Sequence, residues 1–201
     1  MLDRFRQFWT TLFAPLARLL LRLGVSPDVV TVVGTVGVVA GALLFFPQGR
    51  FVEGVLVVSV FVFSDLVDGH MARLSGRSST WGAFLDSTLD RVGDAAIFGG
   101  LVLWFAGAGD SPWLASLALY DLVVGNLTSY ARARAEALGM QAKVGIAERA
   151  DRLTLILVAT FFSGLLDLTV LLVVALAVLG MASTATVVQR MVVVHRQASR
   201  G

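Results

Sequence analysis

Aspartates gather in the middle of this very apolar chain, and they are the residues best suited to chemistry. Asp65 and Asp68 are three positions apart, and Asp86 and Asp90 are four positions apart. On an α-helix, both spacings place the two side chains of a pair on one face. The connection at residues 74–81 is short and rich in Ser and Gly, so we expect an antiparallel helical hairpin. Such a hairpin would place the four carboxylates close to one another.

Carboxylates this close together in a poorly hydrated setting need a counter-charge, because desolvation and mutual repulsion favour the protonated form. A hard divalent cation supplies that charge, and oxygen ligands without Cys or His suit Mg²⁺, Mn²⁺ or Ca²⁺. Four carboxylates suit two ions about 3.5–4 Å apart, as in phosphoryl displacement. Mg²⁺ is favoured because it binds substrate phosphates. Two alternatives stay open: an ion pathway in a transporter, or ion pairs with Arg73 and Arg91.

The composition explains why these acids stand out. The chain has 201 residues, of which 57% are hydrophobic and 15% are charged, and its mean hydropathy is +0.82. Soluble domains are nearer about 45–50% apolar and 25% charged, so we expect an integral membrane protein. The sequence contains no Cys, which excludes disulfides, thiol nucleophiles and Cys-based metal sites.

Hydrophobic patterning predicts an all-α integral membrane fold with six transmembrane helices and an N-terminal interfacial helix. Residues 1–24 alternate apolar and basic positions at helical spacing, as in an amphipathic helix on a bilayer surface. The transmembrane domain is expected over residues 25–197, followed by a short tail, 198–201. The expected spans lie near 29–46, 51–63 with a polar extension, 81–105 with a polar start, 153–166 and 170–194, and a fourth span starts near Trp113 and continues as helix into "SYARARAEALG" (129–139).

The basic residues predict the orientation. One of them, Arg50, lies between the first two spans, and the rest fall in the terminal segments and in the connections on the opposite side. Lys and Arg concentrate on the cytoplasmic side of membrane proteins. We therefore expect a multi-pass protein of the plasma membrane, with both termini and the acidic cluster on the cytoplasmic side. Nothing in the sequence indicates nucleic-acid binding.

The aspartates belong to a longer pattern that resembles the signature of the CDP-alcohol phosphotransferases, a family of membrane enzymes. In this chain the pattern reads Asp65-x2-Asp68-Gly69-x2-Ala72-Arg73-x8-Gly82-x3-Asp86-x3-Asp90. The stretches "SPDVVTVVGT", "WGAFLD", "SYARARAEALG" and "ERADR" are similar to the phosphatidylinositol phosphate synthase branch found in bacteria. The resemblance covers most of residues 24–160, whereas the last 40 residues match loosely.

The resemblance implies an activity: transfer of a phosphatidyl group from CDP-diacylglycerol to inositol 1-phosphate, with release of CMP. It also implies a homodimer among membrane lipids and two Mg²⁺ ions, with Mn²⁺ as a possible substitute. One ion would be held by Asp65, Asp68 and Asp86, and the other by Asp65, Asp86 and Asp90, with Asp90 as the general base. The residues implied for CDP-diacylglycerol binding are Asp28, Val29, Val30, Thr31, Gly69, Arg73, Ser79 and Thr80.

A second basic cluster suggests how a phosphorylated acceptor could bind. Arg132, Arg152 and Arg190 fall at the cytoplasmic ends of the expected spans 4, 5 and 6, and Arg binds phosphate through a bidentate fork. In the resembling synthases, basic residues at matching positions hold the inositol phosphate. The simpler interpretation is orientation and attraction to anionic lipid headgroups.

Three functions therefore remain open at the level of sequence. The first is the inositol phosphate reaction. The second is a phosphatidylglycerophosphate synthase that uses glycerol 3-phosphate, because the arginines do not distinguish the two acceptors. The third belongs to another class: an ion-coupled transporter or lipid-binding scaffold without chemistry. The position of the acids at one interface and the absence of a visible inverted repeat favour an enzyme over a transporter.

Overall fold

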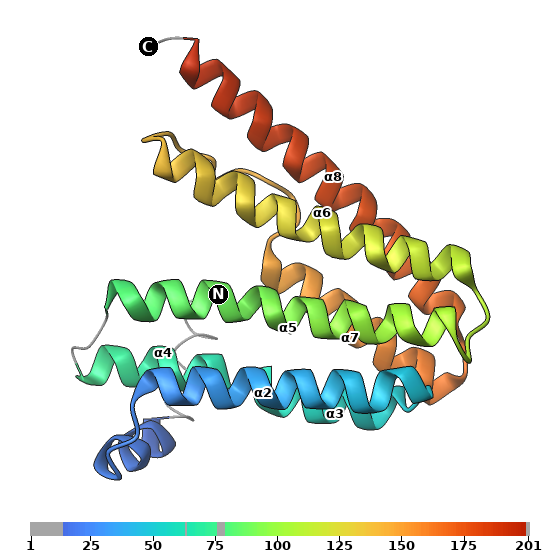
Figure 1. The fold of residues 1–201 in the computed structure, drawn as a ribbon, viewed down its shortest axis with the longest axis horizontal. Helices are drawn as coiled ribbons and strands as arrows, with labels where there is room; N and C mark the ends of the chain where they lie inside the picture. Colours follow the sequence, from blue (N-terminus) through green and yellow to red (C-terminus); the bar gives the residue numbers. More distant parts are fainter. Residues whose placement is uncertain (1–13, 63, 76–78, 200–201) are drawn as a thin grey trace. The chain divides into compact units, whose positions relative to one another are not determined.

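The computed structural model describes residues 14–62, 64–75 and 79–199, with all side chains in these ranges except those of Ser64, Asp65, Leu66, Ala72 and Ser75. Every regular element in the described ranges is a helix (Figure 1). Residues 14–22 are helical. The helices that follow are α2 (Pro27–Phe45), α3 (Phe51–Val62), α4 (Ser64–Ser75), α5 (Thr80–Ala106), α6 (Pro112–Ala137), α7 (Arg149–Leu166) and α8 (Val170–Ala198), with a 3₁₀ turn at Phe46–Gln48.

Residues near the helix N-termini explain where several of the helices begin. The Ser79 hydroxyl accepts a hydrogen bond from the Gly82 N–H at 2.9 Å, which satisfies one of the exposed backbone donors of the first turn of α5. At the start of α7, the Asp151 carboxylate accepts the Glu148 N–H at 3.1 Å. Pro112 occupies the first turn of α6, where its missing N–H costs no helical hydrogen bond.

The first compact unit consists of residues 1–43 and 56–97. Within its described part, the helix at 14–22 packs against α4, with Ala17, Val67 and Met71 almost fully buried. α2 approaches α3 very closely at Gly37, where an added Cβ would lie 2.2 Å from the Phe61 ring. The expected interfacial helix is thus confirmed as a helix over 14–22, whereas residues 1–13 lie outside the described ranges.

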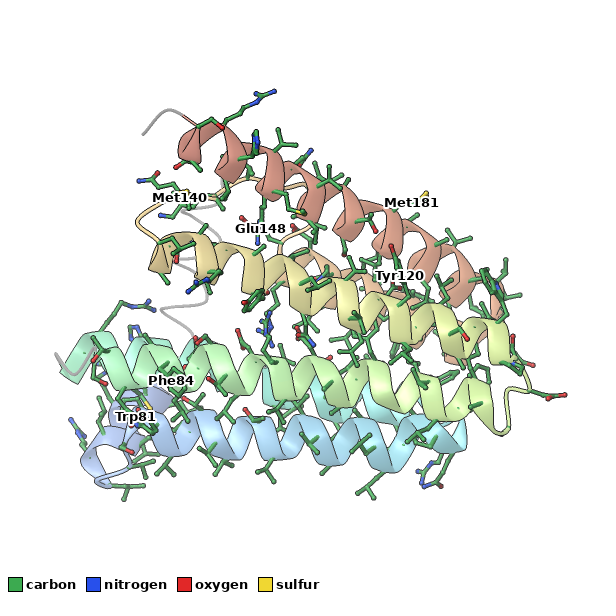
Figure 2. All side chains as sticks on the ribbon, turned by 45° about the horizontal axis from the view of Figure 1, so that its top comes forward. Trp81, Phe84, Tyr120, Met140, Glu148 and Met181 are labelled. Atoms are coloured by element: carbon green, nitrogen blue, oxygen red, sulfur yellow. The ribbon has the colours of Figure 1, made fainter. Side chains whose placement is uncertain are left out.

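The second compact unit consists of residues 44–55 and 98–201. α8 packs against both α6 and α7. Gly180 of α8 gives α6 room to approach, since a Cβ there would lie 2.8 Å from an Asp121 carboxylate oxygen. The Tyr120 hydroxyl, labelled in Figure 2, lies 2.6 Å from the Thr184 hydroxyl and links the same two helices.

The expected helical segments agree with the structure, with one difference. The second expected span appears as two elements, α3 and α4, on either side of position 63. Among the described residues, Pro27–Gln48 and Val170–Ala198 are long and apolar enough to cross a membrane. Large apolar side chains on both segments stay exposed, including Val36 at 62% and Met181 at 67%, as expected for surfaces that face lipid.

Candidate active site

α4 and α5 carry the predicted metal-binding acids, all within the first unit. Asp68 on α4 is 6% exposed, and it lies close enough to Asp86 and Asp90 on α5 to feel their charge. α4 is the polar extension that follows the apolar α3. The Asp68 carboxylate is buried beside the charges of Asp86 and Asp90, and it accepts a hydrogen bond from Thr31. A nearby cation would stabilise these ionised carboxylates.

Thr31 connects the predicted lipid-binding segment to the predicted metal ligands. Its hydroxyl donates to Asp68 Oδ2 at 2.5 Å, which joins α2 to α4. Thr31 is 7% exposed, so the contact is shielded from water. A short hydrogen bond to a carboxylate in such a setting fixes the orientation of the acid.

The starts of α2 and α5 also meet. A Cβ on Gly82 would lie 3.2 Å from the Ser79 hydroxyl and 3.5 Å from Asp28 Oδ1. At Gly69, by contrast, an added Cβ would meet no atom of the described residues within 4 Å. The first glycine therefore permits close packing, while the second faces open space into which a ligand could reach.

The remaining residues implied for CDP-diacylglycerol binding differ in their exposure to solvent. Arg73, Ser79 and Thr80 are exposed. The side chain of Val29 is also exposed, at 51%. Val30 instead packs against the buried cluster of Ala17, Val67 and Met71, so its side chain supports the fold around the acids.

The donor chemistry fits a hard divalent cation, because Asp68, Asp86 and Asp90 offer only carboxylate oxygens. Among the side chains that the structure describes, no three His, Asp or Glu residues form a group that could hold a metal ion. The side chain of Asp65, the fourth predicted ligand, lies outside that set. The complete ligand set therefore stays a prediction.

Arg91 lies beside Asp90, which ends the signature, and Asp94, which follows it on α5. Its Nη2 atom lies 3.6 Å from Asp90 Oδ2 and 3.7 Å from Asp94 Oδ2. Arg91 therefore forms an ion pair with Asp94 one turn further along α5. The same arginine also approaches Asp90, the predicted general base, so the ion-pair interpretation holds for this member of the cluster.

The second unit brings Arg152 and Arg190 together at Thr128 of α6. Arg152 Nη1 donates to the Thr128 hydroxyl at 3.0 Å, and Arg190 Nη1 donates to the Thr128 carbonyl oxygen. The two arginines are only 4% and 5% exposed. Buried guanidinium groups need such partners. Sequence reasoning missed Thr128, because a single Thr in a long helix has no distinctive pattern.

The third predicted arginine, Arg132, lies one helical turn after Thr128 on α6. Its side chain is 41% exposed and pairs with Glu136, with Nε and Oε1 3.0 Å apart. It lies near the C-terminal end of α6 and is far more accessible than Arg152 and Arg190. Its contribution to the pocket stays a prediction.

The connection between α6 and α7 also belongs to this cluster. Arg190 Nε donates to the Val144 carbonyl at 2.9 Å, and Arg152 Nη1 also donates to the Ala147 carbonyl at 3.3 Å. Both arginines therefore hold the connection as well as the helix. Met140 and Glu148, near its two ends, are labelled in Figure 2.

Comparison with known proteins identifies the family. The family model for CDP-alcohol phosphatidyltransferase matches residues 24–181. A phosphatidylinositol phosphate synthase of Streptomyces avermitilis is 50% identical over 99% of this chain and 84% of its own length. One from Cutibacterium acnes is 52% identical over 98% of both chains.

Solved structures of similar proteins support the same family assignment. The crystal structure of Mycobacterium tuberculosis phosphatidylinositol phosphate synthase with CDP-DAG bound is similar with a TM-score of 0.86, at 42% identity, over 90% of this chain and 92% of that chain. The same enzyme in complex with manganese and citrate gives a TM-score of 0.87, covering 90% and 88%. This chain belongs to the CDP-alcohol phosphatidyltransferase family.

Proposed function

We propose that this chain transfers the phosphatidyl group of CDP-diacylglycerol to inositol 1-phosphate, giving phosphatidylinositol phosphate and CMP. The observation that carries the proposal is the identity of about half of all positions, over nearly the whole chain, with two phosphatidylinositol phosphate synthases. An acceptor hydroxyl attacks the phosphatidyl phosphorus, a new P–O bond forms, and the P–O bond to CMP breaks.

The acidic hairpin is the proposed catalytic centre. Asp65, Asp68, Asp86 and Asp90 hold the divalent metal, which we propose to be two Mg²⁺ ions with Mn²⁺ as a substitute. Bound there, the metal neutralises the diphosphate and stabilises the CMP leaving group. Asp90 accepts the proton of the attacking hydroxyl.

The donor lipid binds around the same hairpin in this proposal. The support is local: Thr31 donates to Asp68, and the carboxylate of Asp28, in the first turn of α2, lies near Gly82 in the first turn of α5. Gly69 leaves open space, and Arg73 is exposed and available to a phosphate. Ser79 and Thr80 complete the proposed set.

Arg132, Arg152 and Arg190 form the proposed pocket for the acceptor phosphate. The convergence of Arg152 and Arg190 on Thr128 supports it, because anchored guanidinium forks present a phosphate with a fixed geometry. Orientation and lipid attraction do not require buried arginines, so the burial of this pair favours the pocket.

We further propose that the chain crosses the plasma membrane six times as a homodimer, with an interfacial helix at the N-terminus and both termini cytoplasmic. Two helices of the described ranges that are long and apolar enough to cross a membrane and the asymmetric basic residues support a membrane-spanning arrangement with this orientation. The active site would then face the cytoplasm, where water-soluble acceptors are available.

The decisive experiment supplies the purified enzyme with CDP-diacylglycerol, Mg²⁺ and one acceptor at a time, and measures CMP release. Inositol 1-phosphate should be the preferred acceptor. If glycerol 3-phosphate gives the higher kcat/KM, the enzyme is a phosphatidylglycerophosphate synthase instead. Asp90→Asn should abolish CMP release while the fold persists; a transporter or scaffold would show no CMP release with either acceptor.

A further inference from the structure

The α6–α7 connection, residues 138–148, lacks regular structure apart from a turn at its start, yet side chains of α8 hold it at several points. Gln197 forms a pair of hydrogen bonds with the backbone of Gln141, at 3.0 Å to its N–H and 2.6 Å to its carbonyl. Thr186 of α8 accepts the N–H groups of Ile146 and Ala147, both at 3.2 Å. An irregular segment tied down in this way has a defined conformation.

Thr186 uses its full hydrogen-bonding capacity in these contacts. A hydroxyl has one proton to donate and two lone pairs to accept with. Thr186 Oγ1 donates to the Ala182 carbonyl within α8 at 2.8 Å, which leaves both lone pairs for the two loop N–H groups. The side chain is fully buried, at 0% exposed, so water does not substitute for the hydroxyl.

The backbone opposite Thr186 is adapted to this contact. Gly145 has a φ of +141°, and a Cβ there would lie 2.3 Å from Thr186 Cγ2. Any other residue at this position would therefore collide with Thr186 and strain the backbone. The absence of a side chain at Gly145 therefore allows the loop backbone to pack directly against Thr186.

Two backbone carbonyls of the clamped segment accept hydrogen bonds from the two buried arginines. Val144 precedes the clamp and accepts Arg190 Nε at 2.9 Å, and Ala147 accepts Arg152 Nη1 at 3.3 Å. Thr186 is also one helical turn before Arg190 on α8, so both side chains share a face. The position of each guanidinium thus depends on where the loop backbone lies.

We propose that Thr186 is a positioning residue for the phosphorylated acceptor: it clamps the 138–148 connection onto α8, and the clamped carbonyls hold Arg190 and Arg152 in place for the phosphate. This inference rests on the proposed function of the arginine pocket. Thr186 touches neither substrate in this proposal. It acts through the loop.

The test compares Thr186→Val with Thr186→Ser, which keeps the hydroxyl. In the Val variant we expect KM for inositol 1-phosphate to rise roughly tenfold, with KM for CDP-diacylglycerol and kcat within about twofold of wild type. The Ser variant should have a KM for inositol 1-phosphate close to that of wild type. Gly145→Ala disturbs the same contact from the loop side and should give the same KM pattern.

A matched control separates positioning from general loss of stability. Thr160 is also fully buried, but its hydroxyl donates only along its own helix, to the Ile156 carbonyl at 2.7 Å. Thr160→Val should therefore leave the acceptor KM unchanged. Equal effects of Thr160→Val and Thr186→Val on the acceptor KM would overturn the proposal, as would a Val variant that changes both KM values alike.

Hydrogen exchange provides a readout that does not depend on the reaction. The amides of Ile146 and Ala147 should exchange faster in Thr186→Val than in wild type, whereas those of α7 stay protected. Unchanged protection of the two loop amides would refute the clamp.

The identity of the acceptor is tested separately. If wild type instead prefers glycerol 3-phosphate, the assigned acceptor is wrong, and the same variants are measured with that acceptor. The hydrogen-exchange result does not depend on which acceptor is used.

Discussion

The hydrogen bond between Thr31 and Asp68 gives a sharp prediction, because it joins the first helix of the proposed lipid site to a proposed metal ligand. Thr31→Val removes the hydroxyl and retains a similar shape. The Asp68 carboxylate then loses the donor that lies 2.5 Å from its Oδ2. We expect the variant to fold and to need more Mg²⁺ for the same rate of CMP release.

The size of the effect follows from burial. Thr31 and Asp68 are 7% and 6% exposed, so water does not replace the missing donor. A hydrogen bond to a charged group contributes about 1.5–3 kcal/mol, and each 1.4 kcal/mol corresponds to about a factor of ten. Partners that orient metal ligands have effects of about 10- to 100-fold on metal affinity. The half-saturating Mg²⁺ concentration should therefore rise roughly 10- to 100-fold.

The assay measures CMP release at saturating CDP-diacylglycerol and inositol 1-phosphate across a Mg²⁺ titration. Thr31→Ser keeps the donor and should resemble wild type. Thr35→Val is the matched control, since Thr35 donates only to the Thr31 carbonyl of its own helix, at 3.0 Å. A Mg²⁺ requirement that is the same in Thr31→Val and Thr35→Val would refute the reasoning.

Three further predictions concern other parts of the chain. Arg190→Lys keeps the charge but loses the fork, so the acceptor KM should rise roughly tenfold in steady-state assays while that for CDP-diacylglycerol is unchanged. Gly69→Ala adds a methyl group to open space inside helix α4, so thermal stability should not fall, and KM for CDP-diacylglycerol should rise if the lipid approaches the backbone there. Gly37→Ala places a Cβ 2.2 Å from the Phe61 ring and should destabilise the fold by about 1–3 kcal/mol in an unfolding assay.

The helices were predictable from sequence because hydropathy and turn signals act locally. The break at residues 167–169 illustrates this: the sequence offered only "SGLLDL" as a signal, and the structure ends α7 at Leu166 and begins α8 at Val170. Asp167 takes a left-handed conformation there, with φ of 53°, which Asp tolerates better than most residues.

The contacts that organise the candidate site could not be predicted in this way. Thr31 and Asp68 are 37 positions apart, and Thr128 and Arg190 are 62 apart. A Thr in an apolar helix has no pattern that distinguishes a tertiary donor from one bonded within its own helix, as Thr160 is. Charge and spacing indicated the aspartates and arginines; only the fold shows which neutral side chains hold them.

Direct measurement of metal binding tests the central claim most sharply. Mn²⁺ is titrated against the purified protein, against Asp86→Asn, and against Asp110→Asn, a control in a connecting turn where Asp110 has φ of 42° and Asn is equally tolerated. The account predicts about two ions bound by wild type and by Asp110→Asn, with binding lost in Asp86→Asn. Undiminished binding by Asp86→Asn would contradict the account.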